Sequence, residues 1–546
     1  WGLRRCVDVN NNFNSITGSV SGNYNYALDG SGVDVVIQDS GIQTDHPEWV
    51  NTKDELIDTV QGGTATFNFV DNNKATYDLY VPYYGFGIPN YLASMTSTPW
   101  ANGQYDGVEF LIRFVLANGE TVERTRIFGG IGPGTVTTEK NTFEIDTDGT
   151  IAIEQTDEDL RLELATLAQN GVIQLWLLSG GSRLRQIDWY GASGLSGTQS
   201  ANFYRDRDGH GTHCAGIAAG KTYGWAKGAN VYAQKLAGLE TLQGPDGTGI
   251  PAADAFDSIR LWHNAKTNGR PTVVNMSWGY LGEQAGNPTS GTYRGTPWTF
   301  NLADNILNLY GLPGAIYSGS ARYPVQVSAV DAEIEDMIDA GIHICLAAGN
   351  DFYKADVVAG DDYNNTVVHN ATTYSYHRPG SPYSNRAFFV GSIDNISNSG
   401  IDRPANYSKK GPAVNVWAPG SKILSTASNL NDTSYNSVTF TYPTDSNYSV
   451  MNIGGTSMAS PQVAGLLALY LQSQPTISPD DLLNKVIGDS SAVISDTGLD
   501  NDYTADTASL MGSSNRLLYS RYGVANTSSI TGSLLLSNFN LSIATT

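Results

Sequence analysis

The segment Gly454–Gly465 sets a serine between a pair of glycines and a run of small residues, and it constrains the fold more than any other part of the chain. It reads Gly-Gly-Thr-Ser-Met-Ala-Ser-Pro-Gln-Val-Ala-Gly. Gly454 and Gly455 permit a turn in which a Cβ would clash, and the small residues that follow begin a helix. We therefore expect Ser457 at the amino end of a helix, where backbone N–H groups and the positive end of the helix dipole stabilise negative charge.

Two other segments carry an acid and a base. Val-Val-Ile-Gln-Asp-Ser-Gly-Ile ends at Ile42, and His-Gly-Thr-His-Cys-Ala-Gly begins at His210. In chain order the three segments supply Asp39, His210 and Ser457. A serine hydroxyl is a weak nucleophile until a base removes its proton, and a carboxylate can orient that base and stabilise its charged form. The three residue types therefore point to acyl transfer.

These segments, in this order, resemble the subtilisin-like serine proteases, or subtilases, in which Asp precedes His and His precedes Ser. Cys214, directly after the His motif, and the short segment Ala219–Gly228 are similar to the proteinase K branch. The resemblance implies an α/β fold, a subtilisin-like three-layer core with a mostly parallel sheet, and a serine endopeptidase that forms an acyl-enzyme. It also implies that His210, the first histidine of its motif, is the base and that His213 is structural.

The resemblance extends to groups that would bind the substrate carbonyl and the P1 side chain. Asn350, in Leu-Ala-Ala-Gly-Asn, matches the asparagine of the family's oxyanion hole, in which the backbone N–H of Ser457 is the second donor. Removing such a donor from a subtilisin lowers the rate about 10²–10³-fold. The small residues Ala347, Ala348 and Gly349 would form one wall of the S1 pocket. Asp351 would favour a basic P1 residue if it lies at the pocket floor.

Two segments resemble the edges on which subtilases align a substrate as an added strand. The first is Asn-Met-Ser-Trp-Gly, which contains Ser277, Trp278 and Gly279. The second contains Gly247 and Gly249, in Pro-Asp-Gly-Thr-Gly. Trp278 stands where relatives often carry Leu, and it is either a core residue or narrows a substrate subsite.

Other chemically active residues near the motifs have simpler interpretations. Asp206 and Asp208 could raise the basicity of the histidine or hold a basic substrate side chain, but solvated loop charges are favoured. Cys214 is expected to be a small buried residue. With Cys6 and Cys345 it makes three cysteines, which leaves open either one disulfide and a free thiol or three thiols.

Apolar β-branched runs alternate with amphipathic stretches outside the three motifs. This alternation predicts an α/β core with a mostly parallel sheet, which places Asp39 and Asn350 at strand carboxyl ends, where such sheets carry their sites. The predicted strands are Val33–Ile37, Asn230–Gln234, Thr272–Asn275 and Ile342–Leu346, and the predicted helices include Ala252–Asn264 and Ala329–Ala340.

The spacing between Asp39 and His210 departs from the family. It is 171 residues (210 minus 39), where family members commonly need a few dozen. Residues 55–185 are therefore expected to be an inserted β-rich domain. Alternating residues on both sides of Asn118-Gly119, and again on both sides of Asp148-Gly149, predict two β-hairpins. The predicted division is a catalytic domain in two parts, 1–54 and 186–523, the insert 55–185, and a C-terminal tail, 524–546. Residues 279–323 and 350–379 are expected to be long surface loops.

Composition restricts partners and location. The formal charge is −22, from 31 basic and 53 acidic residues, which disfavours nucleic acid and anionic membranes. No run of 18 uncharged apolar residues occurs, so no membrane insertion is expected. Protein or peptide substrates follow from the resemblance. The chain begins with Trp1 rather than Met. Since subtilases are usually made with an N-terminal pro-region and secreted, we expect a processed, secreted product.

No cofactor is expected for the chemistry, and no zinc-type cluster is visible. Structural calcium stays open. Glu48 matches the position of one calcium ligand of the family but lacks its loop, and Asn415 stands where the proteinase K branch offers a carboxylate. Acidic loops such as Asp361-Asp362 could bind calcium elsewhere.

Two other classes of function compete with a secreted endopeptidase. The first is a structural or self-processing component of a virion or a cell surface, with residues 55–185 contacting an assembly partner. The second is a lipase-like serine esterase, which is disfavoured because the nucleophile motif is not Gly-x-Ser-x-Gly.

Overall fold

A computed structural model describes the residues that carry the three motifs and most of the predicted core. The described residues are 1–8, 11, 25–43, 46–49, 206, 208–236, 252–266, 269–302, 304, 306–312, 320–394, 401–429, 439–497 and 509–524; between 55 and 186 only backbone strands are described.

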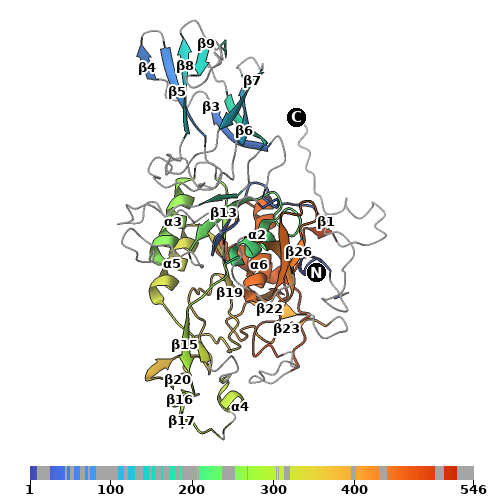
Figure 1. Cartoon of the computed structure of the whole chain (residues 1–546). Helices are drawn as coiled ribbons and strands as arrows, with labels where there is room; N and C mark the ends of the chain where they lie inside the picture. Colours follow the sequence, from blue (N-terminus) through green and yellow to red (C-terminus); the bar gives the residue numbers. More distant parts are fainter. Residues whose placement is uncertain are drawn as a thin grey trace, which may run out of the picture.

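The core is built on an eight-stranded sheet (Figure 1). The strand order is β12-β13-β2-β14-β19-β22-β23, with β24 pairing to β22, and every neighbouring pair except β22–β23 is parallel. The strands are β2 (Asp34–Asp39), β12 (Leu184–Gln186), β13 (Asn230–Lys235), β14 (Thr272–Met276), β19 (His343–Ala347), β22 (Phe388–Asp394), β23 (Arg403–Pro404) and β24 (Val416–Pro419).

The inner strands are buried on both faces, as their β-branched sequences predict. Every residue of β2 and of β14 is buried. The four strands predicted from apolar runs are present, with ends displaced by no more than two residues, and the α/β prediction is confirmed.

Helices cover both faces of the sheet and complete the three layers (Figure 1). On one face, α3 (Ala252–Ala265) and α5 (Ser328–Asp339) pack on Val36 and Val274. On the other, α2 (His210–Ala219) and α6 (Thr456–Ser473) pack on Val35 and Val273. The remaining helices of the core are α1 (Gly2–Arg5) and α7 (Pro479–Asp489).

The small residues of α6 allow it to lie directly against α2. A Cβ at Gly465 would clash with the backbone oxygen of Ala218, so glycine is required at this crossing. A three-stranded antiparallel sheet leads into α6 and consists of β25 (Ile423–Ala427), β26 (Thr439–Thr441) and β27 (Ser449–Ile453). This arrangement places the second residue of α6, Ser457, against α2, where the Sγ of Cys214 lies 3.4 Å from its carbonyl oxygen.

The strands between β2 and β12 form two antiparallel sheets, which gather at one end of the molecule in Figure 1. Both predicted hairpins are present, as the pairs β6–β7 and β8–β9. Because β12 pairs with β13 in the central sheet, the core resumes at Leu184, just inside the predicted end of the insert. The strands are β3 (Glu55–Gln61), β4 (Asn68–Asp71), β5 (Lys74–Val81), β6 (Val108–Val115), β7 (Thr121–Phe128), β8 (Glu139–Asp146), β9 (Thr150–Ile153), β10 (Leu162–Glu163) and β11 (Val172–Ser179).

The prediction of long surface loops at 279–323 and 350–379 is wrong. The two segments pair with each other through β16 and β20 and share a small core that includes Trp298, Tyr353 and Tyr376. The strands are short, and although β16–β17 and β20–β21 are local hairpins, the pairings β15–β18 and β16–β20 join segments far apart in the chain. The elements are β15 (Leu281–Ala285), β16 (Ser290–Tyr293), β17 (Thr296–Thr299), α4 (Ile306–Tyr310), β18 (Ser320–Pro324), β20 (Thr366–His369) and β21 (Thr372–Tyr374).

The last described strand pairs with the first strand of the chain. Strand β28 (Gly523–Val524) pairs antiparallel with β1 (Asn25–Tyr26). The predicted tail therefore begins with a strand residue, and the rest of it, 525–546, lies outside the described residues.

Candidate active site

Asp39 and His210 meet where β2 ends and α2 begins. Nδ1 of His210 lies 2.8 Å from Oδ1 and 3.0 Å from Oδ2 of Asp39. The carboxylate is 4% exposed and its Oδ1 also accepts from the backbone N–H of Ser40 at 2.7 Å. The imidazole is therefore held through Nδ1, which leaves Nε2 as the nitrogen that can exchange a proton with a substrate or a nucleophile.

Two glycines of the His motif make this meeting sterically feasible. Gly209 precedes α2 with φ of +83°, in the left-handed region that favours glycine. At Gly211 a Cβ would clash with the backbone oxygen of Gly41, in the loop that follows Asp39. The helix can therefore approach the end of β2 only because these positions carry no side chain.

Ser457 makes two hydrogen bonds with Ser277. Its Oγ donates to the carbonyl oxygen of Ser277 at 3.1 Å, and the Oγ of Ser277 donates to the carbonyl oxygen of Ser457 at 2.8 Å. Cys214 lies between Ser457 and the imidazole, with its Sγ 3.4 Å from the Ser457 carbonyl oxygen and 3.8 Å from Nδ1 of His210. The structure thus brings all three predicted residues to one site.

Asn350 follows β19 and is oriented by the first residue of α6. Its Oδ1 accepts from the backbone N–H of Thr456 at 2.8 Å and from the Thr456 hydroxyl at 2.9 Å. Because the carboxamide oxygen is bound in this way, the Nδ2 group is the part of Asn350 that can donate to a substrate. Sequence reasoning missed Thr456, although it stands directly before Ser457 in the motif.

One of the two glycines before Ser457 lies against this donor. A Cβ at Gly455 would lie 3.2 Å from Nδ2 of Asn350 and would crowd that donor. A Cβ at Gly454 would meet nothing closer than 3.5 Å, which is ordinary contact. The expected clash at Gly454 is therefore wrong, and Gly455 is the residue that protects the donor.

The environments of the two motif histidines are opposite. Burial disfavours charge on His210, but the carboxylate of Asp39 outweighs it, so the pKa of His210 is raised well above its ordinary value. His213 is fully buried, with Nε2 at 3.1 Å from the carbonyl oxygen of Ile423 and 3.0 Å from that of Met451. Burial lowers the pKa of His213 to about 3. His213 is thus a neutral side chain that holds two backbone segments together.

Comparison with known proteins is decisive for the family. Residues 30–505 match the subtilase family, peptidase S8. The chain belongs to this family. A subtilisin-like serine protease of Penicillium citrinum, Pen c 2, is 27% identical over 358 residues, which cover 63% of this chain and 60% of that protein. A subtilisin-like protease of Coccidioides posadasii is 28% identical over 358 residues, which cover 63% of this chain and 55% of that protein.

This subtilase therefore spans less than two thirds of the length of these relatives. Among solved structures, that of a cold-adapted subtilisin-like serine proteinase is 18% identical, covers 95% of this chain and 97% of its own, and has a TM-score of 0.42. Within the described part of the subtilase, no helix has the length and hydropathy needed to cross a membrane.

Asp206 is the clearest correction within the site. It is completely buried, so the favoured interpretation of a solvated loop charge is wrong. Its oxygens accept four hydrogen bonds, one from Ser40 and the others from the first turn of α2 at Gly209 and Thr212. Ser40 is distant in the chain, so the local sequence did not indicate burial. Asp208 is partly buried.

All three cysteines of the subtilase are free and buried, which settles the open alternative in favour of three thiols. Burial raises the pKa of the Cys214 thiol, so it stays protonated at neutral pH. Within the described residues, Asp39, His210 and Cys214 make up the one group of three side chains placed to hold a metal ion. The group therefore consists of the two motif residues, Asp39 and His210, and the thiol of Cys214 beside them.

The expected S1 wall follows β19. Ala347 ends the strand, Ala348 is 3% exposed, and Gly349 has φ of +111°, which favours glycine. The carboxylate of Asp351 accepts from Nζ of Lys409 at 2.9 Å, and both side chains are buried. A Cβ at Gly349 would lie 3.2 Å from Cε of Lys409. The charge of Asp351 is therefore compensated by an adjacent lysine, which argues against a preference for basic P1 residues.

Trp278 is both a core residue and a surface residue. Its ring stacks on Phe256 with centroids 6.1 Å apart and meets the ring of Tyr280 edge-on at 5.7 Å. The side chain is half-buried, while Gly279 beside it is exposed. Trp278 thus packs against the core, and its narrowing of a substrate subsite stays a prediction. Gly247 and Gly249, on the opposite predicted edge, lie outside the described residues.

Three of the residues considered as calcium ligands already bind other groups of the protein. The Glu48 carboxylate accepts from the backbone N–H of Thr222 and from the hydroxyl of Tyr442. Asn415 bonds the backbone through both ends of its carboxamide. Asp362 is buried and ion-paired with Arg294 and Lys354.

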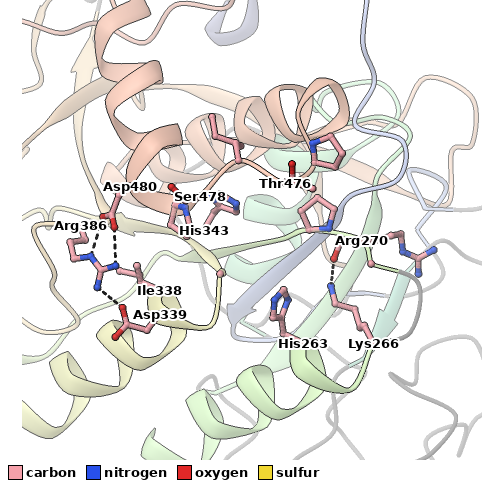
Figure 2. A pocket seen from close by; sticks show the side chains of 16 residues that line it. His263, Lys266, Arg270, Ile338, Asp339, His343, Arg386, Thr476, Ser478 and Asp480 are labelled. Atoms are coloured by element: carbon pink, nitrogen blue, oxygen red, sulfur yellow. Dashed lines mark hydrogen bonds and ion pairs between the residues drawn. The ribbon is translucent and has the colours of Figure 1, made fainter.

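A cavity of about 480 Å³ lies at the amino ends of the central strands, opposite the ends that carry the site (Figure 2). It is lined by residues at the beginnings of β14 and β19, whereas Asn350 follows the end of β19. Lys266 is bound to Asp34 at 2.9 Å, and Arg386 is bound to Asp339 and Asp480 at 2.7 and 2.9 Å. The cavity is therefore separate from Ser457, and these two cations already have acidic partners.

Proposed function

We propose that this subtilase is a serine endopeptidase and that Ser457 forms the acyl-enzyme. The observation that carries the proposal is the 2.8 Å contact between Asp39 Oδ1 and His210 Nδ1, made beside the helix whose second residue is Ser457. For the reaction, the Ser457 hydroxyl would turn from the carbonyl oxygen of Ser277 toward Nε2 of His210. The base then accepts the proton as Oγ attacks the peptide carbonyl.

In the tetrahedral intermediate the oxyanion accepts from the backbone N–H of Ser457 and from Nδ2 of Asn350. The bonds from Thr456 to Oδ1 support this role, because they aim the carboxamide before substrate arrives. The imidazolium of His210 is stabilised by Asp39 and donates its proton to the leaving amine. A water molecule then hydrolyses the acyl-enzyme by the same steps, with His210 again as the base.

The substrate is proposed to be an extended stretch of protein or peptide. Its backbone would lie along Ser277, Trp278 and Gly279, with Gly247 and Gly249 on the other side. Ala347, Ala348 and Gly349 leave room for a large P1 side chain. Since the Asp351 carboxylate is compensated by Lys409, we propose that this side chain is apolar rather than basic.

We further propose that the enzyme is secreted, that its chemistry needs no cofactor, and that any calcium is structural. No nucleic acid or membrane insertion is invoked. Residues 55–185 would then adjust access of substrates or attach the enzyme to a surface. An inert scaffold in a virion or cell-surface assembly is less well supported, because the charged pair and the oriented asparagine are both intact.

Labelling with a fluorophosphonate probe, followed by hydrolysis of casein, tests the proposal. We expect stoichiometric labelling of the wild-type chain, loss of labelling in Ser457→Ala, and casein hydrolysis only by the wild type. Circular dichroism of the variant checks that its fold is intact. Equal labelling of a folded Ser457→Ala variant would refute Ser457 as the nucleophile, and labelling without hydrolysis of any peptide would refute the endopeptidase.

A further inference from the structure

Asp206 joins the two segments that supply the base and its carboxylate partner. Its Oδ1 accepts from the hydroxyl of Ser40 at 2.8 Å and from the backbone N–H of Gly209 at 2.8 Å. Its Oδ2 accepts from the backbone N–H and the hydroxyl of Thr212, at 2.8 and 2.6 Å. Each oxygen thus has two donors, and Gly209 and Thr212 flank His210 in the chain.

The partners of Asp206 extend the network to both sides of the catalytic pair. The Oγ of Ser40 also accepts from the backbone N–H of Gly211, at 2.8 Å, and the backbone N–H of Ser40 donates to Asp39. On the other side, the hydroxyl of Thr212 accepts from the backbone N–H of Gln43 at 2.9 Å. The residues next to Asp39 and next to His210 are therefore tied to one buried carboxylate.

We propose that Asp206 is a positioning residue that sets the distance between Asp39 and His210. This inference rests on the proposed function for its catalytic meaning. Asp206 accepts its four hydrogen bonds from Ser40, Gly209 and Thr212, so it acts on the backbone before and after the imidazole and not on the ring itself. A carboxylate suits the place because, when ionised, it accepts four bonds without offering a donor of its own. Burial raises the pKa of Asp206, and the hydrogen bonds from Thr212, Gly209 and Ser40 act against this rise.

The carboxamide of asparagine has the same shape but cannot satisfy the same donors. Its NH₂ group would face either the two donors of Thr212 or those of Ser40 and Gly209, so at least one pair of bonds would be lost. The first turn of α2 would then be free to shift relative to β2. A displacement of about 1 Å in a catalytic group can lower a rate about a hundredfold.

The shift should also appear in the protonation of His210. Asp39 and Cys214 are the titratable groups that raise the pKa of His210, and His213 lies on the next turn. If the pair with Asp39 loosens, the imidazolium loses part of its stabilisation, and the pKa of His210 moves down toward the ordinary value of about 6.5. A residue that only supports the fold would lower the amount of folded enzyme and leave this pKa unchanged in a variant that keeps every charge, such as Ser40→Ala.

The experiment compares the wild type with Asp206→Asn. We expect kcat per active site, counted with the fluorophosphonate probe, to fall about tenfold to a hundredfold, while KM stays within about twofold. NMR titration of the histidine ring signals should show a lower pKa for His210. Asp402→Asn is the matched control, because Asp402 is equally buried and is bound by Arg5 and Asn11. It should change neither kcat nor the pKa of His210.

Ser40→Ala is a second variant in case Asp206→Asn does not fold. It removes one donor to Asp206 and should shift kcat and the pKa of His210 in the same direction by a smaller amount. Unchanged kcat and pKa in whichever of the two variants folds would overturn the proposal. The NMR titration separates this failure from that of the proposed function, since the pKa of His210 reports on its pairing even in a protein that hydrolyses nothing.

Discussion

Asp39 and His210 are separated by 171 residues in the chain, yet Nδ1 of the histidine lies 2.8 Å from the carboxylate. The contact is made because α2 begins beside the carboxyl end of β2, on the side of the sheet where the parallel strands end. Glycine at 209 and 211 lets the helix approach this edge. The long intervening segment leaves the core after β2 and returns as β12, two strands from β2 in the sheet.

The oxyanion role of Asn350 predicts a loss in kcat rather than in binding. In Asn350→Ala, kcat should fall about 10²–10³-fold with little change in KM, because the donor matters most in the transition state. Steady-state kinetics on a chromogenic peptide measures both constants. Thr456→Val removes one of the two bonds to Oδ1 and should lower kcat by a smaller factor. An increase in KM alone in Asn350→Ala would exclude the oxyanion role.

The raised pKa of His210 predicts that activity is lost early on acidification. Only the neutral imidazole can accept a proton from Ser457, so kcat/KM should fall as pH drops through the pKa of His210. Since Asp39 raises this pKa, the midpoint should lie above the ordinary value of about 6.5. A pH profile of kcat/KM below pH 9 gives the midpoint. Full activity at pH 5 would contradict His210 as the base.

Titration of His210 and of His213 should affect stability in opposite directions. A raised pKa in the folded state stabilises the fold at low pH, and this contribution disappears as pH rises through the folded value. The pKa of His213 is lowered to about 3, so the unfolded chain takes up a proton that the folded chain refuses. The contribution of His213 is thus present above about pH 6.5 and is lost as pH falls toward 3. Denaturant unfolding of wild type and His213→Gln between pH 4 and 8 should show a shallower acid dependence in the variant, and equal slopes would argue against a neutral buried His213.

The buried pair of Asp351 and Lys409 predicts a change in P1 preference when it is broken. In Lys409→Met the carboxylate beside Gly349 loses its partner, so kcat/KM for lysine at P1 should rise about tenfold relative to phenylalanine. The variant should also lose about 3–5 kcal/mol of stability, because a buried charge is left uncompensated. The double variant Asp351→Asn, Lys409→Met removes both charges and should restore the original preference. If the single variant keeps the wild-type ratio, Asp351 does not reach the S1 pocket.

The sequence was most informative where function requires particular residues in a short segment. Asp39, His210, Asn350 and Ser457 each lie in a motif, and the strands that lead to Asp39 and Asn350 are continuous apolar runs. The supporting residues are less visible. The burial of Asp206 depends on Ser40, and the neutralisation of Asp351 depends on Lys409, 58 residues further along the chain.

The same limit explains the mistaken loops. Strands β16 and β20 have four residues each, too few for an alternating pattern to stand out, and their pairing joins segments more than 70 residues apart. The aromatic residues Trp298, Tyr353 and Tyr376 form a core only once this pairing brings them together. Local sequence can predict a long strand or a motif, but not a small sheet assembled from distant pieces.

The segment between β2 and β12 should affect access of substrates without supplying any of the chemistry. Its strands pair among themselves in two sheets, and Asp39, His210, Asn350 and Ser457 all lie outside it. Replacement of residues 55–183 by a short Gly/Ser linker should therefore leave the core folded, because such a linker can join the ends without imposing a geometry.

The predicted result of this deletion is a difference between small and large substrates. Hydrolysis of a short chromogenic peptide should keep kcat/KM within about threefold, since the short peptide needs only the cleft itself. Cleavage of folded proteins, or binding to a surface, should change clearly, because both ends of the segment join the parts of the chain that carry Asp39 and His210. Equal rates on both kinds of substrate would show the segment to be without effect on access. Loss of short-peptide hydrolysis in a variant that circular dichroism shows to be folded would instead make the segment part of the active site.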